Sequence, residues 1–241
     1  MGSKKMKYKC IECGSSVESL YRDYKANIIK IHHCESCQSV ADKYIEYEPI
    51  IILLDALLLQ PQAYRHLLLN TQFDAHWRLA FLFWICDAFS KLVLQRVELT
   101  NSQPSSGSEY VNYTYLGLEL YLNFIIAATE LLVLTVVVLS VYALKHFCTQ
   151  GDLKHFSPSL IFKAVIIASL GHVLAIPALL WGQLYRNVYI HLTQGFVCLS
   201  TIQALRVVNQ RKYNTFWAVL AVIFGFSAQM VVSSKMHYWL G

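Results

Sequence analysis

Two Cys-x-x-Cys pairs stand near the start of the chain, Cys10-Ile11-Glu12-Cys13 and Cys34-Glu35-Ser36-Cys37. Two residues between the cysteines let both sulfur atoms of a pair reach one ion from a single tight turn, and two such turns complete a tetrahedral site. Gly14 follows the first pair, where such a turn requires a permissive backbone. The spacing therefore predicts a zinc site formed by the thiolates of Cys10, Cys13, Cys34 and Cys37.

Disulfide bonds or free buried thiols are the alternatives to zinc. A disulfide framework is typical of small cysteine-dense chains in an oxidising compartment, whereas this chain has seven cysteines, an odd number. His32 and His33 directly precede Cys34 and could replace a ligand, but four cysteines at matched spacing favour an all-cysteine site with exposed histidines. Because four thiolates leave no open position for water, we expect the Zn²⁺ to be structural.

The segment between the pairs predicts a β-hairpin, because apolar residues flank the stretch 23–27, which can turn. We therefore expect residues 1–48, called the cysteine module below, to form a small zinc ribbon on the cytosolic side. Residues 1–76 hold nine Lys/Arg and nine Asp/Glu. Since a nucleic-acid reader concentrates its basic residues on one face, this balance predicts no nucleic-acid partner.

The rest of the chain has the composition of a membrane protein. Hydrophobic residues make up 56% and charged residues 15% of the sequence, against roughly 25% charged residues in ordinary soluble domains. Apolar runs predict a mainly α, multi-pass helical domain over residues 77–241 with four or five spans. The candidate spans are 77–94, 116–144, 160–181, 188–208 and 216–232.

Two of these spans carry irregular features. The segment 188–208 either crosses the bilayer or re-enters it, because it contains the polar residues His191, Thr193, Gln194, Ser200, Thr201 and Gln203. In the span 160–181, Gly171 and Pro177 predict a kink whose freed backbone groups need a neighbouring helix.

Basic residues beside the spans predict a cytosolic N-terminus. The residues expected on the cytosolic side are Lys145, Lys154, Lys163, Arg206, Arg211 and Lys212, and the weaker opposite set is Lys91, Arg96, Arg186 and Lys235. The stretch 100–107 is predicted to be disordered, and Asn112-Tyr113-Thr114 after it is a glycosylation acceptor that fits a luminal loop.

Residues 49–76 link the cysteine module to the first span. The apolar run 49–59 is too short to cross a bilayer, so it is either an interfacial helix or a helix packed against the bundle. Tyr64, Arg65 and His66 follow it on the cytosolic side. They could bind a lipid headgroup through a bidentate Arg65 contact, or could simply anchor the chain at the interface.

Several ionisable residues lie in or at the edge of the predicted spans: Asp87, Glu119, Glu130, His172 and Arg206. Each costs roughly 2.5–3.5 kcal/mol at the bilayer centre, so such groups face the bundle interior or a polar cavity. We expect Glu130, His172 and Arg206 to form an intramembrane polar site. Pairing of Glu130 with Arg206 or His172 is the simpler interpretation, and a groove for lipid headgroups is the alternative.

The combined pattern resembles the Arv family (ACAT-related protein required for viability). The residues that carry the resemblance are both cysteine pairs, Tyr21-Arg22-Asp23-Tyr24, the run 42–49, and residues 63–66 with Asn70. It is dense over residues 8–71 and looser over the spans. The resemblance implies a multi-pass endoplasmic reticulum protein that acts in sterol transport, cholesterol metabolism and sphingolipid homeostasis. It also implies a role in early glycosylphosphatidylinositol (GPI) anchor biosynthesis.

Two functions from different classes fit these observations. The sequence shows no nucleophile–base pair, glycine-rich phosphate loop or open metal site, so it favours a protein that is not an enzyme. The first function is lipid movement or flipping, with membrane lipids (a sterol, sphingolipid or glycolipid) as the partners. The second is a non-catalytic scaffold or accessory subunit whose partner is a membrane lipid-synthesis or GPI-anchor enzyme.

Overall fold

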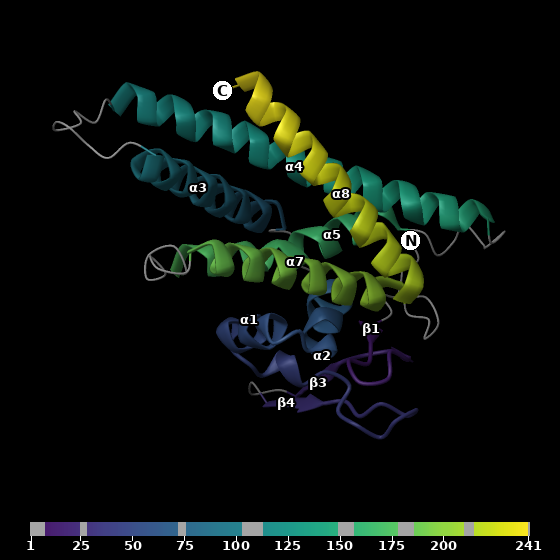
Figure 1. Cartoon of the computed structure of the whole chain (residues 1–241). Helices are drawn as coiled ribbons and strands as arrows, with labels where there is room; N and C mark the ends of the chain where they lie inside the picture. The colour runs from purple at the N-terminus through teal and green to yellow at the C-terminus, as the bar shows by residue number, and fades with distance from the viewer. Residues whose placement is uncertain are drawn as a thin grey trace, which may run out of the picture.

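The computed structural model describes residues 8–24, 28–71, 76–102, 113–148, 157–177, 186–209 and 215–240. Figure 1 shows the N-terminal strands and short helices at one end of the molecule and a group of long helices above them. The glycosylation acceptor Asn112 lies outside the described residues, as does the predicted loop beyond Ser102.

The cysteine module consists of two short antiparallel hairpins. Strand β1 (Tyr8–Lys9) pairs with β2 (Ser16–Val17), and β3 (Tyr21–Tyr24) pairs with β4 (Ile28–Ile31). The second pair confirms the hairpin predicted between the two Cys-x-x-Cys motifs. A small core fills the module and consists of Cys10, Val17, Leu20, Cys34 and Ala41.

Four short helical segments follow the strands: η1 (Lys43–Ile45), α1 (Pro49–Leu57), α2 (Pro61–Arg65) and the π-helix η2 (His66–Asn70). Both α1 and α2 begin with proline, whose fixed φ suits the first helical position and whose missing N–H costs nothing there. Leu59 adopts a left-handed φ of 57° and turns the chain between the two helices.

Helix α1 has two different faces. Ile52 and Ala56 are buried in the main hydrophobic core. Apolar side chains are exposed elsewhere along the run, at Ile50, Ile51, Leu53, Leu54 and Leu58. The helix therefore packs against the helical domain on one side. This agrees with the second of the two interpretations of the run 49–59, a helix packed against the bundle. Its interfacial role stays a prediction.

The helical domain consists of α3 (His76–Ser102), α4 (Tyr113–Cys148), α5 (Pro158–Ala168), η4 (Ser169–Leu174), α7 (Arg186–Asn209) and α8 (Thr215–Leu240). Three helical stretches in the described part of the chain are long and apolar enough to cross a bilayer: Leu116–Lys145, Pro158–Pro177 and Thr215–Met236. They match three of the predicted spans. The predicted spans 77–94 and 188–208 are helical in α3 and α7, so the count of four or five stays a prediction.

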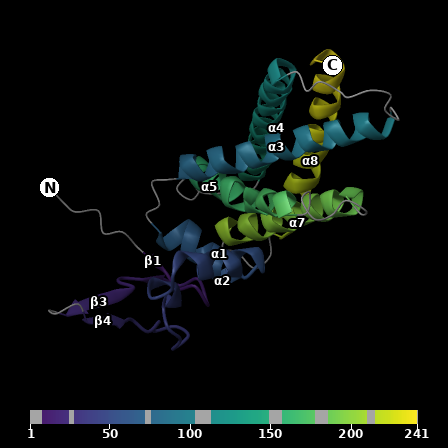
Figure 2. The same cartoon turned by 90° about the vertical axis from the view of Figure 1, so that its left-hand side faces the viewer.

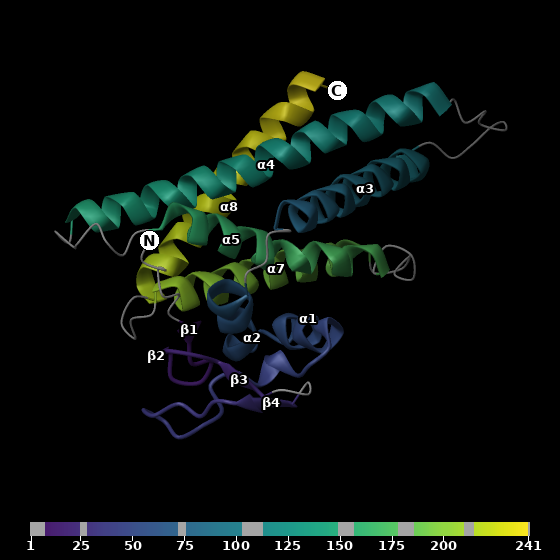
Figure 3. The same cartoon turned by 180° about the vertical axis from the view of Figure 1, so that it is seen from behind.

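Helix α7 lies between the N-terminal unit and the other long helices. Figures 2 and 3 show α7 above α1 and α2, with α5 beside it and the pair α4 and α8 farther from α1 and α2. One face of α7 packs on α2, and other faces pack on α5, η4 and α8. One continuous hydrophobic core therefore runs from Tyr64 in α2 through Leu205 in α7 to Ile166 in α5.

The predicted kink near Gly171 is present as a change of helix type. The α-helix α5 ends at Ala168, and a 3-10 segment continues to Leu174. A Cβ atom on Gly171 would lie 2.6 Å from Cδ1 of Phe196 and 2.8 Å from Cγ2 of Val197. Side chains of α7 therefore lie so close to the backbone of η4 that any residue larger than glycine would force them to shift.

Gly171→Ala should lower the free energy of unfolding by about 1–3 kcal/mol, because the added methyl group overpacks the contact with α7. Gly117→Ala is the matched control, since a Cβ at Gly117 meets nothing within 4 Å and alanine favours a helix over glycine. Thermal unfolding of both detergent-purified variants measures the difference. Equal loss of stability in the two variants would contradict the close approach.

Candidate metal centre and interhelical polar site

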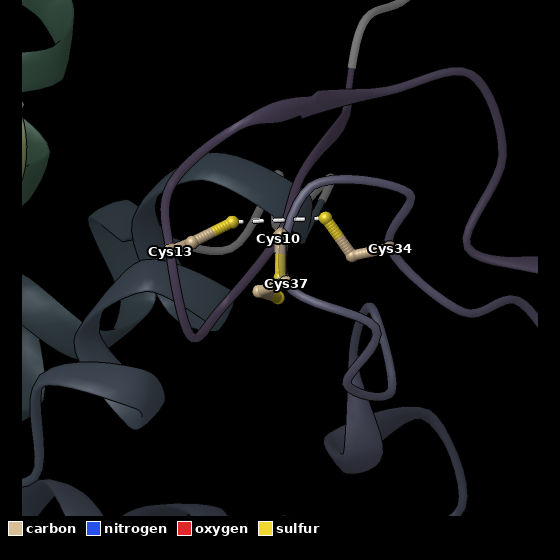
Figure 4. Close-up of side chains that lie close together, drawn as sticks. All are labelled: Cys10, Cys13, Cys34 and Cys37. Atoms are coloured by element: carbon tan, nitrogen blue, oxygen red, sulfur yellow. Dashed lines mark hydrogen bonds between the residues drawn. The ribbon is translucent and has the colours of Figure 1, made fainter.

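The four predicted ligands converge on one point. Their sulfur atoms all lie within 4.8 Å of one another, and Figure 4 shows them pointing inward from the two turns. The Sγ atoms of Cys10 and Cys37 are 3.7 Å apart, and those of Cys13 and Cys34 are 3.6 Å apart. A tetrahedron with Zn–S bonds of about 2.3 Å has S–S edges of about 3.8 Å. The geometry therefore fits a metal ion, whereas a disulfide would need about 2.0 Å.

The two turns that carry the cysteines have the same backbone geometry. The N–H of Gly14 donates to the carbonyl of Cys10 at 3.0 Å, and the N–H of Gln38 donates to the carbonyl of Cys34 at 2.8 Å. Gly14 has a φ of 79° and Gln38 a φ of 60°. Only the glycine was identified from the sequence. Gln38 occupies the equivalent position, one residue after the second pair. That shared position could have predicted its left-handed φ from the sequence.

The donor set indicates a closed structural site. Four thiolates complete a tetrahedral sphere, and such sites are typical of Zn²⁺. Burial raises the pKa of the Cys10 thiol to about 12, so a bound cation would be needed to hold it as a thiolate at neutral pH. His32 and His33 are exposed and lie outside the cluster, as predicted. The residues present thus fit a metal ion, and Zn²⁺ remains the expected one.

Cys34→Ser should abolish metal binding and the order of the cysteine module together, because bound metal supplies much of the folding free energy of so small a unit. Metal analysis of the purified chain, combined with limited proteolysis, measures both effects. Cys198→Ser is the control, since Cys198 lies in α7 and outside the cluster. A Cys34→Ser chain that keeps one metal ion would contradict the four-cysteine site.

The cysteine module is joined to the helices through a buried carboxylate. Asp42 is fully buried. Its Oδ1 accepts from the Tyr44 N–H at 3.0 Å, and its Oδ2 lies 2.7 Å from both the Asn70 amide and Nδ1 of His66. Asn70 also bonds both the N–H and the carbonyl of Lys9 in β1, at 2.9 and 2.8 Å. The π-helix η2 therefore holds strand β1 and the end of the module at once.

Two neighbouring side chains extend this junction. The Arg65 guanidinium donates to the carbonyls of Ile11 and Glu12, at 2.6 and 2.5 Å, inside the first cysteine turn. Tyr64 is buried, and its hydroxyl lies 2.7 Å from the Ser200 hydroxyl in α7. The residues predicted to bind a lipid headgroup, Tyr64, Arg65 and His66, thus all have partners within the protein. Their role as a headgroup site stays a prediction. Asp42 and Asn70, which form the centre of the junction, were not predicted from the sequence.

Asp42→Ala should lower the free energy of unfolding by roughly 3 kcal/mol, because it leaves buried donors on Tyr44, His66 and Asn70 without an acceptor. It should also detach the module, so that trypsin cleaves there sooner than in the parent chain. Glu35→Ala is the control, since Glu35 is exposed in the same module. Protection from trypsin that survives Asp42→Ala would contradict the role of this carboxylate.

A second polar cluster lies among the long helices. The Lys91 ammonium in α3 donates to Asp87 Oδ2 at 2.8 Å and to Glu130 Oε2 in α4 at 2.6 Å. The Gln229 amide in α8 donates to the same Glu130 oxygen at 3.0 Å. Nδ1 of His172 in η4 lies 3.1 Å from Asp87 Oδ1. Four helical segments are thus joined by charge-assisted hydrogen bonds, which are the strong kind.

The structure changes the expected membership of this site. It brings Glu130 and His172 into one network, but Glu130 pairs with Lys91 and His172 pairs with Asp87. The pairing expected between Glu130 and Arg206 is wrong, because the Arg206 side chain is exposed on α7. Lys91 had been assigned to a membrane boundary. Lys91 follows Asp87 by four residues, so both side chains lie on one helix face. That spacing could have predicted their pairing from the sequence.

A cavity of about 460 Å³ lies beside this network. Its lining comes from α3, α4, α5, η4, α7 and α8 and includes Asp87, Lys91, Glu130, His172 and Gln229. The remaining wall is largely apolar, with Phe83, Leu131, Leu134, Ile166 and Phe226. A volume in the range of ligand pockets, an apolar wall and a few convergent polar groups are the features of a small-molecule site.

A cluster of four cysteines that could hold a metal ion, joined to apolar helices of bilayer-crossing length, defines a class: membrane proteins with a small cysteine-rich N-terminal module. The comparison with known families is specific. The chain belongs to the Arv1-like family, whose model matches residues 9–205.

Two of the relatives below match almost the whole chain, and a third matches a quarter of it. Protein ARV1 of Homo sapiens is 34% identical over 240 residues, which is 99% of this chain and 86% of the relative. Protein arv1 homolog of Dictyostelium discoideum is 27% identical over 238 residues, which is 95% of this chain and 94% of the relative. Protein ARV1 of Candida albicans is 53% identical over 62 residues, or 25% of this chain and 21% of the relative. No solved structure matches the chain. Membership of the family places the chain among membrane proteins of sterol and lipid homeostasis.

Proposed function

We propose that this chain is an endoplasmic reticulum membrane protein that moves lipid within or between membranes, and that it acts in sterol transport and sphingolipid homeostasis. The cavity beside the Lys91 network carries the proposal. Its apolar wall would hold the hydrocarbon part of a lipid, while the polar groups at Glu130 and Gln229 would hold the headgroup. The Arv1-like family supports the setting.

The arrangement of the N-terminal unit supports a membrane-surface position with the cysteine module in the cytosol. The exposed apolar residues of α1 would enter the headgroup region, as in helices that lie in the interface. Reduced thiols, which a metal site requires, persist in the cytosol. In this arrangement the metal supports the fold and takes no part in any chemistry, and the chain acts without catalysis.

Lipid movement requires no covalent step. The Lys91 network joins α3, α4, η4 and α8 by hydrogen bonds in addition to the packing between these helices. Such bonds can be exchanged for bonds to a lipid headgroup when the helices separate, because a charged group in a membrane must always keep a partner. The headgroup would thus replace one protein partner during entry and release.

A scaffold or accessory subunit of a membrane lipid-synthesis or GPI-anchor enzyme is the second candidate. The rigid junction at Asp42 favours it, since the module is held in one orientation against the helices. Tyr21 and Tyr47 are exposed on this unit, and exposed tyrosines are enriched in protein interfaces.

Purified protein in liposomes should transfer labelled sterol to acceptor liposomes, and Glu130→Gln should reduce the rate at least fivefold by breaking the bond to Lys91. Glu35→Gln, a change in an exposed carboxylate far along the chain, is the matched control. Affinity purification from membranes runs beside the assay. Absence of transfer, together with an enzyme that co-purifies and is lost with Cys34→Ser, would refute lipid movement in favour of the scaffold.

A further inference from the structure

The two cysteine turns of the metal site differ in what holds them in place. The second turn is bonded within its own loop: the N–H of Cys34 donates to the Ser39 carbonyl at 2.8 Å, and the side-chain amide of Gln38 donates to the Glu35 carbonyl at 3.2 Å. Glu35 and Ser36, the two residues between its cysteines, are exposed. The second turn therefore has the form of a surface loop.

The first turn is bonded instead to the helical segments that follow the cysteine module. Arg65, the last residue of α2, donates from one nitrogen, Nη1, to the carbonyls of Ile11 and Glu12. These are the two residues between the cysteines of the first turn. Asn70 in η2 bonds both backbone polar groups of Lys9, the residue before that turn, at 2.9 and 2.8 Å. The backbone of the first turn is thus held from α2 and η2.

The Ile11 side chain attaches the same turn by packing. Ile11 is only 1% exposed, and it belongs to the main hydrophobic core with Ala63 and Tyr64 of α2, not to the small core of the module. Its N–H donates to the Ala41 carbonyl at 2.9 Å. One residue of a metal-binding turn is therefore part of the core of the helical domain, and the shape of the turn is tied to the position of α2.

That shape matters for the affinity of the site. Two cysteines of a pair reach one ion only when the backbone between them forms a tight turn, and a site that is ordered only on binding loses binding free energy to that ordering. The bonds from Arg65 to both carbonyls hold the turn in this form. If they raise the affinity for metal by some factor, linkage requires that bound metal strengthens the contact with α2 by the same factor.

We infer that Arg65 is a positioning residue for the metal site, and that metal binding is energetically coupled through the first cysteine turn to the docking of the cysteine module on α2. The presence of metal thereby strengthens the contact between the module and α2, which continues through the bond of Tyr64 to Ser200 in α7. The inference depends on the metal site alone and not on the movement of lipid.

Metal affinity of the full chain in detergent tests the role of Arg65. Arg65→Met keeps an apolar stem but removes the donors, so it should weaken the binding of Co²⁺ and Zn²⁺ roughly tenfold, within the range usual for coupled sites. Competition with a chromophoric chelator gives the affinity, and the thiolate-to-cobalt charge-transfer absorption shows whether all four ligands remain. Arg22→Met is the matched control, because Arg22 is exposed on β3 of the same module.

Hydrogen exchange followed by mass spectrometry tests the coupling itself. In the unmodified chain, removal of the metal by a chelator should speed the exchange of residues 61–70 as well as that of the cysteine turns. Arg65→Met should speed exchange in residues 61–70 more in the metal-loaded chain than in the metal-free chain. A side chain that only supported docking would have the same effect in both. The measurement on the unmodified chain remains decisive even if Arg65→Met fails to fold.

The inference is overturned if folded Arg65→Met and Arg22→Met chains bind metal equally, or if removal of the metal leaves the exchange of residues 61–70 unchanged. It is overturned as well if Arg65→Met acts equally with and without metal, or if the parent chain binds neither ion. None of these results bears on sterol transfer between liposomes, so the inference and the proposed lipid movement stand or fall separately.

Discussion

A buried carboxylate, Asp42, is the constraint on which the position of the cysteine module depends. An isolated charge in a protein interior is costly, so it persists only where enough donors surround it. Here those donors come from two separate segments, the Tyr44 N–H beside it and the side chains of His66 and Asn70 in η2. Separation of the module from the π-helix would therefore break several buried hydrogen bonds. The chain of contacts continues from Tyr64 to Ser200 in α7 and thus reaches the helical domain.

The same physical rule governs the helical domain. Lys91 sits between two carboxylates and ties α3 to α4, while Gln229 brings in α8 and His172 brings in η4. Among the described residues that line the adjoining cavity, the one ammonium group, that of Lys91, is already paired with two carboxylates. A network of this kind stabilises the bundle, because each charged group within it keeps a partner. The cysteine cluster and the junction thus fix the position of the module, and the cavity lies apart from both, among the long helices.

Sequence reasoning succeeded where the determining interactions are local. The pairing of β3 with β4 followed from apolar residues on both sides of a turn, and the cysteine cluster followed from the spacing within each pair. The 3-10 segment near Gly171 was signalled by glycine and proline in an apolar run. The predicted boundary between the cysteine module and the segment 49–76 does not separate two independent units, because Lys9 and Asn70 are hydrogen-bonded across it. No periodicity reports a contact between residues 61 positions apart.

What the sequence by itself determined is the set of parts: a four-cysteine module, apolar helices of bilayer length, and the presence of ionisable groups that must find partners. Residue spacing and hydropathy are patterns over short stretches of chain, so they can be recognised without knowledge of the fold. The tertiary structure alone decided which partners those groups have. Arg206 and Lys91 are equally basic in the sequence, yet the rotation of each helix exposes the first and directs the second to Glu130. The cavity and its charge balance depend on that choice, since they are properties of surfaces formed by six separate segments.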